Sequence, residues 1–146
     1  MIILAIDTST DAVSVAVNNS KKLLASAHVA SDRRHAEQLV PMIETVCRQA
    51  DIEVSEVDVV AVDVGPGLFT GMRVGIASAK SIAQVLNVPI IGVSSLDTLA
   101  RSVSTTDRVV VSTIDARRGE FYWALYRNDV GSSLDAEHDG RRVDMQ

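Results

Sequence analysis

The spacing of apolar residues changes near residue 35, and this change limits the chain to a mixed α/β fold. Before it, apolar positions alternate, as in residues 12–18, which is typical of strands with one buried face. From Ala36 onward they recur every three or four positions, which predicts an amphipathic helix. The predicted strands cover 2–7, 12–18, 22–30, 57–64 and 89–93, and the predicted helices cover 35–50, 70–87 and 95–103. This order, βββαβαβα, predicts a mixed five-stranded sheet covered by helices.

Local signals place the starts of the first two helices. Ser31 or Asp32 is expected to cap the helix at 35–50, and Pro41 is expected to bend it because proline removes one backbone donor. Thr70 is expected to cap the helix at 70–87, after a tight turn made by Gly65-Pro66-Gly67.

The dipeptide Ile-Asp occurs twice after a strand-like run, at Ile6-Asp7 and at Ile114-Asp115. At the same offset, Val13, Val15, Ala16 and Val17 fall opposite Phe121, Trp123, Ala124 and Leu125. This internal repeat predicts a second copy of the fold that begins at residue 108. The predicted domains are a first lobe at 1–105 and an incomplete second lobe at 106–146, which holds a hairpin at 108–127 and a polar tail at 128–146 without helical or strand period. The tail is expected to be disordered or a fragment of something longer.

The composition argues against several classes of protein. The net charge is −5 and the five aromatic residues are mostly confined to 121–126, so the chain is not expected to bind nucleic acid or membranes by itself. The single cysteine, Cys47, excludes an intramolecular disulfide. Because no signal peptide or membrane span is apparent, a cytoplasmic location is expected.

The glycine-rich stretch 65–75 reads GPGLFTGMRVG and fits neither common phosphate loop. Met72 and Arg73 follow Gly71 where a Walker loop has Lys and then Ser or Thr, and Thr70 stands where a dinucleotide fingerprint needs glycine. Small residues follow at four-residue steps, at Gly71, Gly75, Ala79 and Ala83. This bare ridge could receive the backbone of another subunit or pack on the chain's own sheet. Arg73, a cation in the first helical turn, is expected to face an acidic group or a bound anion.

Three further side chains are candidates for binding a metal or a nucleotide. His35 would need a second histidine at position 39 to bind a metal, and that position is Leu39, so a lone surface histidine is expected. Asp7 and Asp115 could hold magnesium and phosphates in a two-lobed nucleotide site. Each could instead cap its own turn, which the absence of glycine in Thr8-Ser9-Thr10 favours.

Four segments in collinear order resemble the TsaB family of tRNA threonylcarbamoyladenosine biosynthesis: IDTST at 6–10, RRHAEQLVP at 33–41, GPGLFTGMRVG at 65–75 and DARRGEFYWALY at 115–126. The resemblance covers about residues 2–127. It implies the actin-like ATPase fold of two ribonuclease H-like lobes, the second of them incomplete here. Leu68 departs from the small polar residue usual at its position.

The resemblance also implies a non-catalytic subunit without its own cofactor. Such a subunit pairs with TsaD, which with TsaE supplies ATP and metal binding, and it meets tRNA only within that complex. Self-association as a homodimer is implied as well. The residues expected at the partner interface are Gly71, Arg73, Val74, Gly75, Ser78, Ala79, Ile82, Ala83, His35 and Leu39. Asp7, Thr8, Ser9 and Asp115 are expected to form a vestigial nucleotide or anion loop. In the alternative, Asp7 and Asp115 alone hold magnesium in an ATP-dependent transferase or kinase of the actin-like superfamily.

Overall fold

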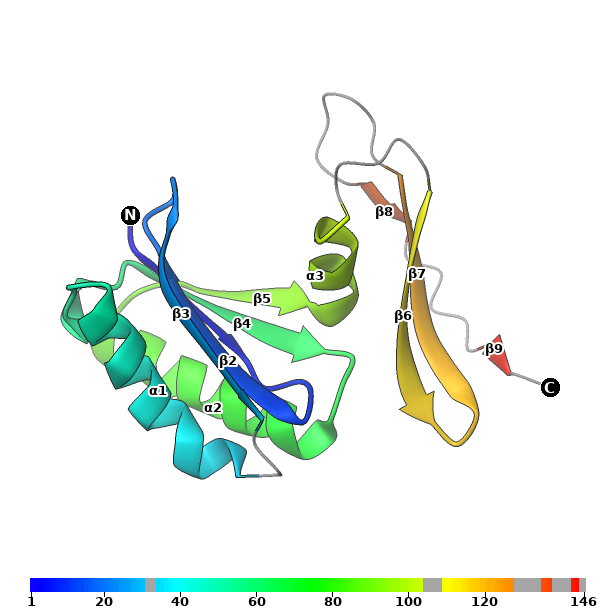
Figure 1. The fold of residues 1–146 in the computed structure, drawn as a ribbon, viewed down its shortest axis with the longest axis horizontal. Coiled ribbons are helices and arrows are strands. Elements are labelled where there is room, and N and C mark those ends of the chain that lie inside the picture. The colour runs from blue at the N-terminus through cyan, green and yellow to red at the C-terminus, as the bar shows by residue number, and fades with distance from the viewer. Residues whose placement is uncertain (31–33, 104–108, 128–134, 138–142, 145–146) are drawn as a thin grey trace. The chain divides into compact units, whose positions relative to one another are not determined.

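The structure is a computed structural model, and it describes residues 1–30, 34–103, 109–127, 135–137 and 143–144. Two compact units make up the chain (Figure 1). The first holds Met1–Val64 and Leu68–Val93, and the second holds Gly65–Gly67 and Ser94–Gln146. No helix among the described residues is long and apolar enough to cross a membrane.

The first unit is a five-stranded sheet with two long helices on one face (Figure 1). Its strands are β1 (Ile3–Asp7), β2 (Ala12–Asn18), β3 (Leu23–Ala30), β4 (Val59–Gly65) and β5 (Ile90–Ser94). They lie in the order β3-β2-β1-β4-β5. β1 pairs antiparallel with β2 and parallel with β4. The helices are α1 (His35–Gln49) and α2 (Phe69–Leu86), and a short 3₁₀ helix, η1, spans Val54–Glu56. The predicted mixed sheet is confirmed.

The core of this unit lies between the sheet and the two helices. Burial alternates along β2, where Val13, Val15 and Val17 are buried, because successive strand residues point to opposite faces. Leu39 and Val46 of α1 pack into the same cluster at the spacing of an amphipathic helix. The alternation that predicted strands therefore also identified the buried face.

The structure places the starts of both long helices. α1 begins after Arg34 without a side-chain cap, and Ser31 and Asp32 lie outside the described residues. α2 begins after Leu68, so the prediction that Thr70 caps it is wrong. The Leu68 amide instead donates to the Ser9 carbonyl at 2.6 Å, which ties the start of the helix to the loop after β1. Pro41 lies inside α1, which continues past it to Gln49.

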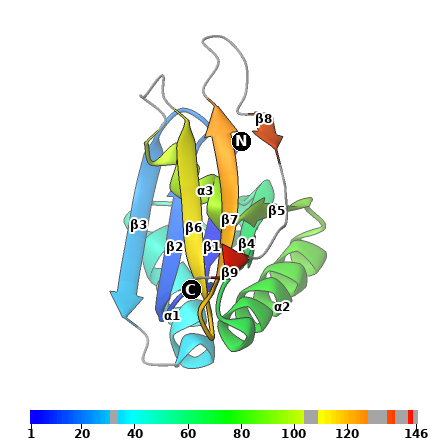
Figure 2. The same ribbon diagram turned by 90° about the vertical axis from the view of Figure 1, so that its right-hand side faces the viewer.

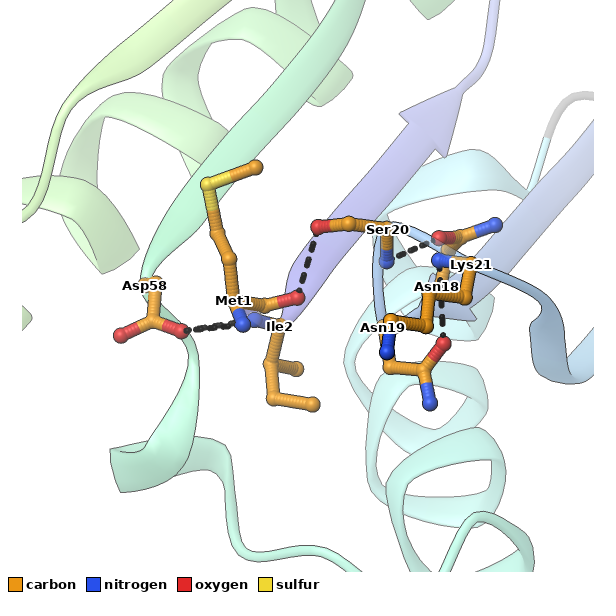
Figure 3. Close-up of polar contacts among 7 residues, drawn as sticks. All are labelled: Met1, Ile2, Asn18, Asn19, Ser20, Lys21 and Asp58. Atoms are coloured by element: carbon orange, nitrogen blue, oxygen red, sulfur yellow. Dashed lines mark hydrogen bonds and ion pairs between the residues drawn. The ribbon is translucent and has the colours of Figure 1, made fainter.

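Polar contacts join the start of β1 to β4 and to the turn between β2 and β3 (Figure 3). The Ile2 amide donates to Asp58 Oδ2 at 2.6 Å, and the Met1 ammonium lies 3.8 Å from the same oxygen. The Ser20 hydroxyl donates to the Met1 carbonyl at 3.1 Å. Because these groups are exposed, the ion pair contributes little to stability, but the contacts join the starts of two central strands to the β2–β3 turn.

The second unit contains α3 (Ser95–Arg101), β6 (Val110–Arg117), β7 (Glu120–Arg127), β8 (Asp135–Glu137) and β9 (Val143–Asp144). β6 and β7 form an antiparallel hairpin (Figure 2). α3 buries Leu96 and Ala100 against Ala124 and Tyr126. This packing places the division at Val93/Ser94, earlier than the predicted boundary at 105.

The predicted tail at 128–146 is partly structured. β8 and β9 both pair with β7, so the expectation of a tail without strands is wrong for these two segments. They escaped detection because two or three residues are too few to show a period. The remaining tail residues lie outside the described part of the chain.

The internal repeat is reproduced, with one shift of register. Both copies form a hairpin after Ile-Asp, but Ile6 pairs with Val15 while Ile114 pairs with Tyr122. The second connection is therefore one residue shorter than the first. As a result the constant offset paired Val15 with Trp123, which lies on the other face of its strand.

Tyr126 links β7 to α3 in the second unit. Its hydroxyl donates to Asp97 Oδ1 at 2.5 Å. Burial and the Asp97 carboxylate raise the pKa of Tyr126, so the folded state holds the phenol proton more tightly than the unfolded state. This contribution to stability is complete below the unfolded pKa of about 10 and is lost as the pH rises through the folded value.

We expect the free energy of unfolding to fall as the pH rises above about 10. Tyr126→Phe should remove this part of the pH dependence and cost about 2 kcal/mol at neutral pH, because it leaves Asp97 without its donor. Urea unfolding between pH 7 and 11 measures both effects. A variant whose alkaline profile matches that of the wild type would contradict the assignment.

Candidate functional site

The candidate site is the loop that follows β1 and the two helix starts that surround it. Asp7 Oδ1 accepts the Ser9 amide at 2.8 Å, two residues along the chain. Asp115 Oδ1 does the same for the Arg117 amide at 2.6 Å. Each aspartate thus caps its own turn, the simpler of the two predicted interpretations.

Thr8 joins this loop to α2. It is buried, and its hydroxyl donates to the Gly71 carbonyl at 2.8 Å. A Cβ atom on Gly71 would lie 2.1 Å from the Thr8 carbonyl oxygen, and one on Gly75 would lie 2.3 Å from Thr8 Oγ1. The two glycines are therefore required because the helix passes so close to the loop.

The ridge of small residues on α2 faces inward. Its four members are all buried within the first unit: Gly71, Gly75, Ala79 and Ala83. The glycines meet Thr8, and the alanines join the core cluster between sheet and helices. The expectation that this ridge receives another subunit is therefore wrong for these four residues, because the chain's own loop and core occupy it.

His35, the first residue of α1, contacts the loop after β1 at a different residue, Thr10. It is only 4% exposed, and its Nε2 donates to the Thr10 carbonyl at 2.8 Å. The prediction of a surface histidine is wrong, and so is the use of His35 at an interface. Leu39 is likewise buried in the core. No group of three or more potential metal ligands occurs among the described residues.

The outward face of α2 carries what remains of the predicted interface. The Arg73 guanidinium lies over the Phe69 ring, 5.3 Å from its centroid, and no carboxylate of the described residues forms an ion pair with it. Phe69 is 70% exposed and Arg73 is exposed, while Val74, Ser78 and Ile82 are half-buried. Phe69 was missed from the sequence, although its spacing of four from Arg73 marks the pair as neighbours on one face.

A cavity of about 520 Å³ lies at the end of α1. Its lining includes Cys47, Arg48 and the acidic residues Glu44, Asp51, Glu53 and Glu56. Burial and the nearby Glu53 raise the pKa of the Cys47 thiol. The thiol is thus protonated at neutral pH and a poor nucleophile.

The tip of the β6–β7 hairpin has an unusual backbone. Arg117, Arg118 and Gly119 all have positive φ, at 67°, 60° and 77°. Arg117 pairs with Glu120, so Arg118 and Gly119 form a two-residue turn. Glycine adopts this region freely, whereas other residues pay roughly 1–2 kcal/mol. The arginine pair is visible in the sequence, but its left-handed backbone conformation could not be predicted from it.

We expect Arg118→Asn to raise the free energy of unfolding by about 1 kcal/mol, because asparagine tolerates the left-handed conformation that Asn-Gly turns use. Urea unfolding measures the change. The matched control is Arg101→Asn in α3, which removes the same charge from a helical position and should destabilise slightly. Equal effects of the two variants would contradict the turn assignment.

Comparison with known proteins places these features in context. The family model for TsaD, tRNA N6-adenosine threonylcarbamoyltransferase, matches residues 22–140. The tRNA threonylcarbamoyladenosine biosynthesis protein TsaB of Escherichia coli K12 is 38% identical over 88% of this chain and 56% of its own length. The protein of that name from Bacillus subtilis 168 is 34% identical over 87% and 56%. The chain thus spans about half the length of these curated relatives.

Solved structures support the same placement. YeaZ from Pseudomonas aeruginosa superposes with a TM-score of 0.85 at 33% identity, covering 98% of this chain and 67% of that one. The ROK hexokinase from Thermus thermophilus has a TM-score of 0.57 at 13% identity, covering 96% of this chain and 50% of that one. The hexokinase is too distant in sequence to indicate more than a shared fold.

Proposed function

This chain belongs to the TsaB family, and from that premise we propose that it acts in tRNA threonylcarbamoyladenosine biosynthesis as a non-catalytic subunit. It pairs with a TsaD-type threonylcarbamoyltransferase in the cytoplasm, assembles with TsaE, and reaches tRNA as part of that complex. ATP and metal bind to the other subunits.

One observation carries the non-catalytic part of the proposal: several polar groups of the loop after β1 are hydrogen-bonded within the chain itself. The Thr8 hydroxyl donates to Gly71, and the Ser9 amide donates to Asp7. The Ser9 carbonyl accepts the Leu68 amide, and the Thr10 carbonyl accepts His35. A phosphate needs free donors at such a loop, and these two donors are engaged.

Calorimetric titration with MgATP tests this part. We expect no binding at micromolar concentrations, because neither Asp7 nor Asp115 is backed by a phosphate-binding turn. A micromolar Kd that Asp7→Asn abolishes would instead support the ATP-dependent transferase or kinase.

Six exposed residues of the two long helices form the proposed docking surface, which we name the α1–α2 surface. It consists of Glu37, Val40, Glu44, Phe69, Arg73 and Lys80. Its exposed carboxylates lie on α1 and its exposed cations on α2. A partner built the same way can therefore set its α2 against this α1 and its α1 against this α2, with opposite charges facing each other twice. A second copy of this chain satisfies that requirement, and the proposal is that a related TsaD-type lobe does so as well. The half-buried Val74, Ser78 and Ile82 flank this surface and remain part of the proposal.

Native mass spectrometry of the chain mixed with a TsaD-type subunit tests the pairing. We expect a one-to-one complex in preference to the homodimer. Separate masses for the two chains at micromolar concentrations would contradict the proposal.

A further inference from the structure

We propose that the tip of the β6–β7 hairpin, at Arg117 and Arg118, is a contact site for the phosphodiester backbone of tRNA. The proposal rests on the function proposed above, because the tRNA is the polyanion that the complex must hold. It adds a direct contact from this subunit, where the composition of the whole chain predicted none.

The backbone holds both arginines in fixed positions at the end of the hairpin. Both have φ in the left-handed region, and the Arg117 amide is anchored to Asp115 Oδ1 at 2.6 Å. Asparagine or glycine would form this turn with less strain, yet the sequence has two long cations there. Strain kept at an exposed tip is a reason to look for a role of the side chains themselves.

The two guanidinium groups are available to a ligand. Both residues are exposed, and within the described residues neither side chain has an ion-pair or hydrogen-bond partner. A guanidinium presents a planar fork of donors that matches phosphate oxygens. Two adjacent forks on a hairpin tip suit an extended backbone of phosphates.

The charge distribution favours this end of the hairpin over the rest of the chain. At the tip, Arg117 and Arg118 lie beside two carboxylates, Asp115 and Glu120, so this end of the hairpin is formally neutral, whereas the whole chain carries −5. Asp115 already accepts the Arg117 amide. A polyanion is therefore repelled less at this tip than by the net charge of the chain as a whole.

The test measures tRNA binding by the complex with the TsaD-type subunit, using fluorescence anisotropy over a range of salt concentrations. Arg117→Gln/Arg118→Gln should weaken binding about tenfold and reduce the slope of log K against log salt by about 2, because each phosphate contact contributes about 0.9. Arg48→Gln/Arg101→Gln is the matched control, since it removes two exposed charges elsewhere and should leave the slope unchanged. Arg118→Asn should bind more weakly while unfolding at higher urea concentration.

Three outcomes overturn the proposal. In the first, the affinity and slope of the tip variant equal those of the wild type. In the second, the control loses as much as the tip variant. In the third, the tip variant loses subunit pairing without any change in tRNA binding. The last result would assign the tip to an acidic protein surface. If the wild-type subunits do not pair at all, the proposed function fails, and the same slopes measured on the isolated chain decide the tip separately.

Discussion

Gly71→Ala should lower the free energy of unfolding by about 3 kcal/mol, the largest effect expected of any single methyl group in this chain. The added Cβ would lie 2.1 Å from the backbone carbonyl oxygen of Thr8, which cannot rotate away. Glycine to alanine in a helix normally stabilises by about 0.5–1 kcal/mol, so here even the sign is reversed. Urea unfolding measures the change.

The matched control is the opposite exchange on the exposed face of the same helix. Ala77→Gly should cost only about 1 kcal/mol, the ordinary difference in helix propensity. If Gly71→Ala proved as stable as the wild type, α2 would not approach the loop as described.

Gly75 offers an internal check on this mechanism, because its added Cβ would meet the Thr8 side chain and not the backbone. In a Thr8→Ala background the cost of Gly75→Ala should therefore shrink, whereas the cost of Gly71→Ala should not. A double-mutant cycle separates the two cases. Equal coupling of Thr8 to both glycines would contradict the contact assignment.

Phe69→Ala should weaken pairing with a TsaD-type subunit about thirtyfold, the effect of removing an aromatic anchor worth roughly 2 kcal/mol. Phe69 is 70% exposed, so its loss should leave the unfolding free energy nearly unchanged. It also holds Arg73 by ring stacking, and both side chains belong to the α1–α2 surface. Titration calorimetry gives the affinity.

Val85→Ala is the control for this prediction. Val85 is 83% exposed on the same helix but lies near its far end, outside the α1–α2 surface. It should pair like the wild type. Wild-type affinity of the Phe69 variant would remove the start of α2 from the interface.

The secondary structure of both hairpins and of the long helices could be predicted because apolar periodicity survives in a single sequence. Whether the ridge on α2 faces the core or the solvent was harder to predict, since small residues at four-residue steps pack equally well inward or outward. The opposite face did carry a signal: Arg73, Lys80 and Gln84 recur at helical spacing, and such charged and polar side chains mark the side of a helix that faces solvent.

The contacts around the loop could not have been predicted from the sequence. His35 and Thr10 lie 25 residues apart, and Thr8 and Gly71 lie 63 apart. No local pattern encodes such pairs, because they depend on how the helices cross the sheet. The same limit explains the register of the second hairpin, where one fewer residue in a turn moved every side chain to the other face.

The loop after β1 has a mechanical consequence for assembly. Thr8 and Ser9 are hydrogen-bonded to the start of α2, and Thr10 is hydrogen-bonded to His35 of α1. These three loop residues therefore connect the two helices to each other. A tilt of either helix would also move the other helix and the end of β1. A docking subunit would therefore bind a rigid surface, without a slow conformational change of this chain.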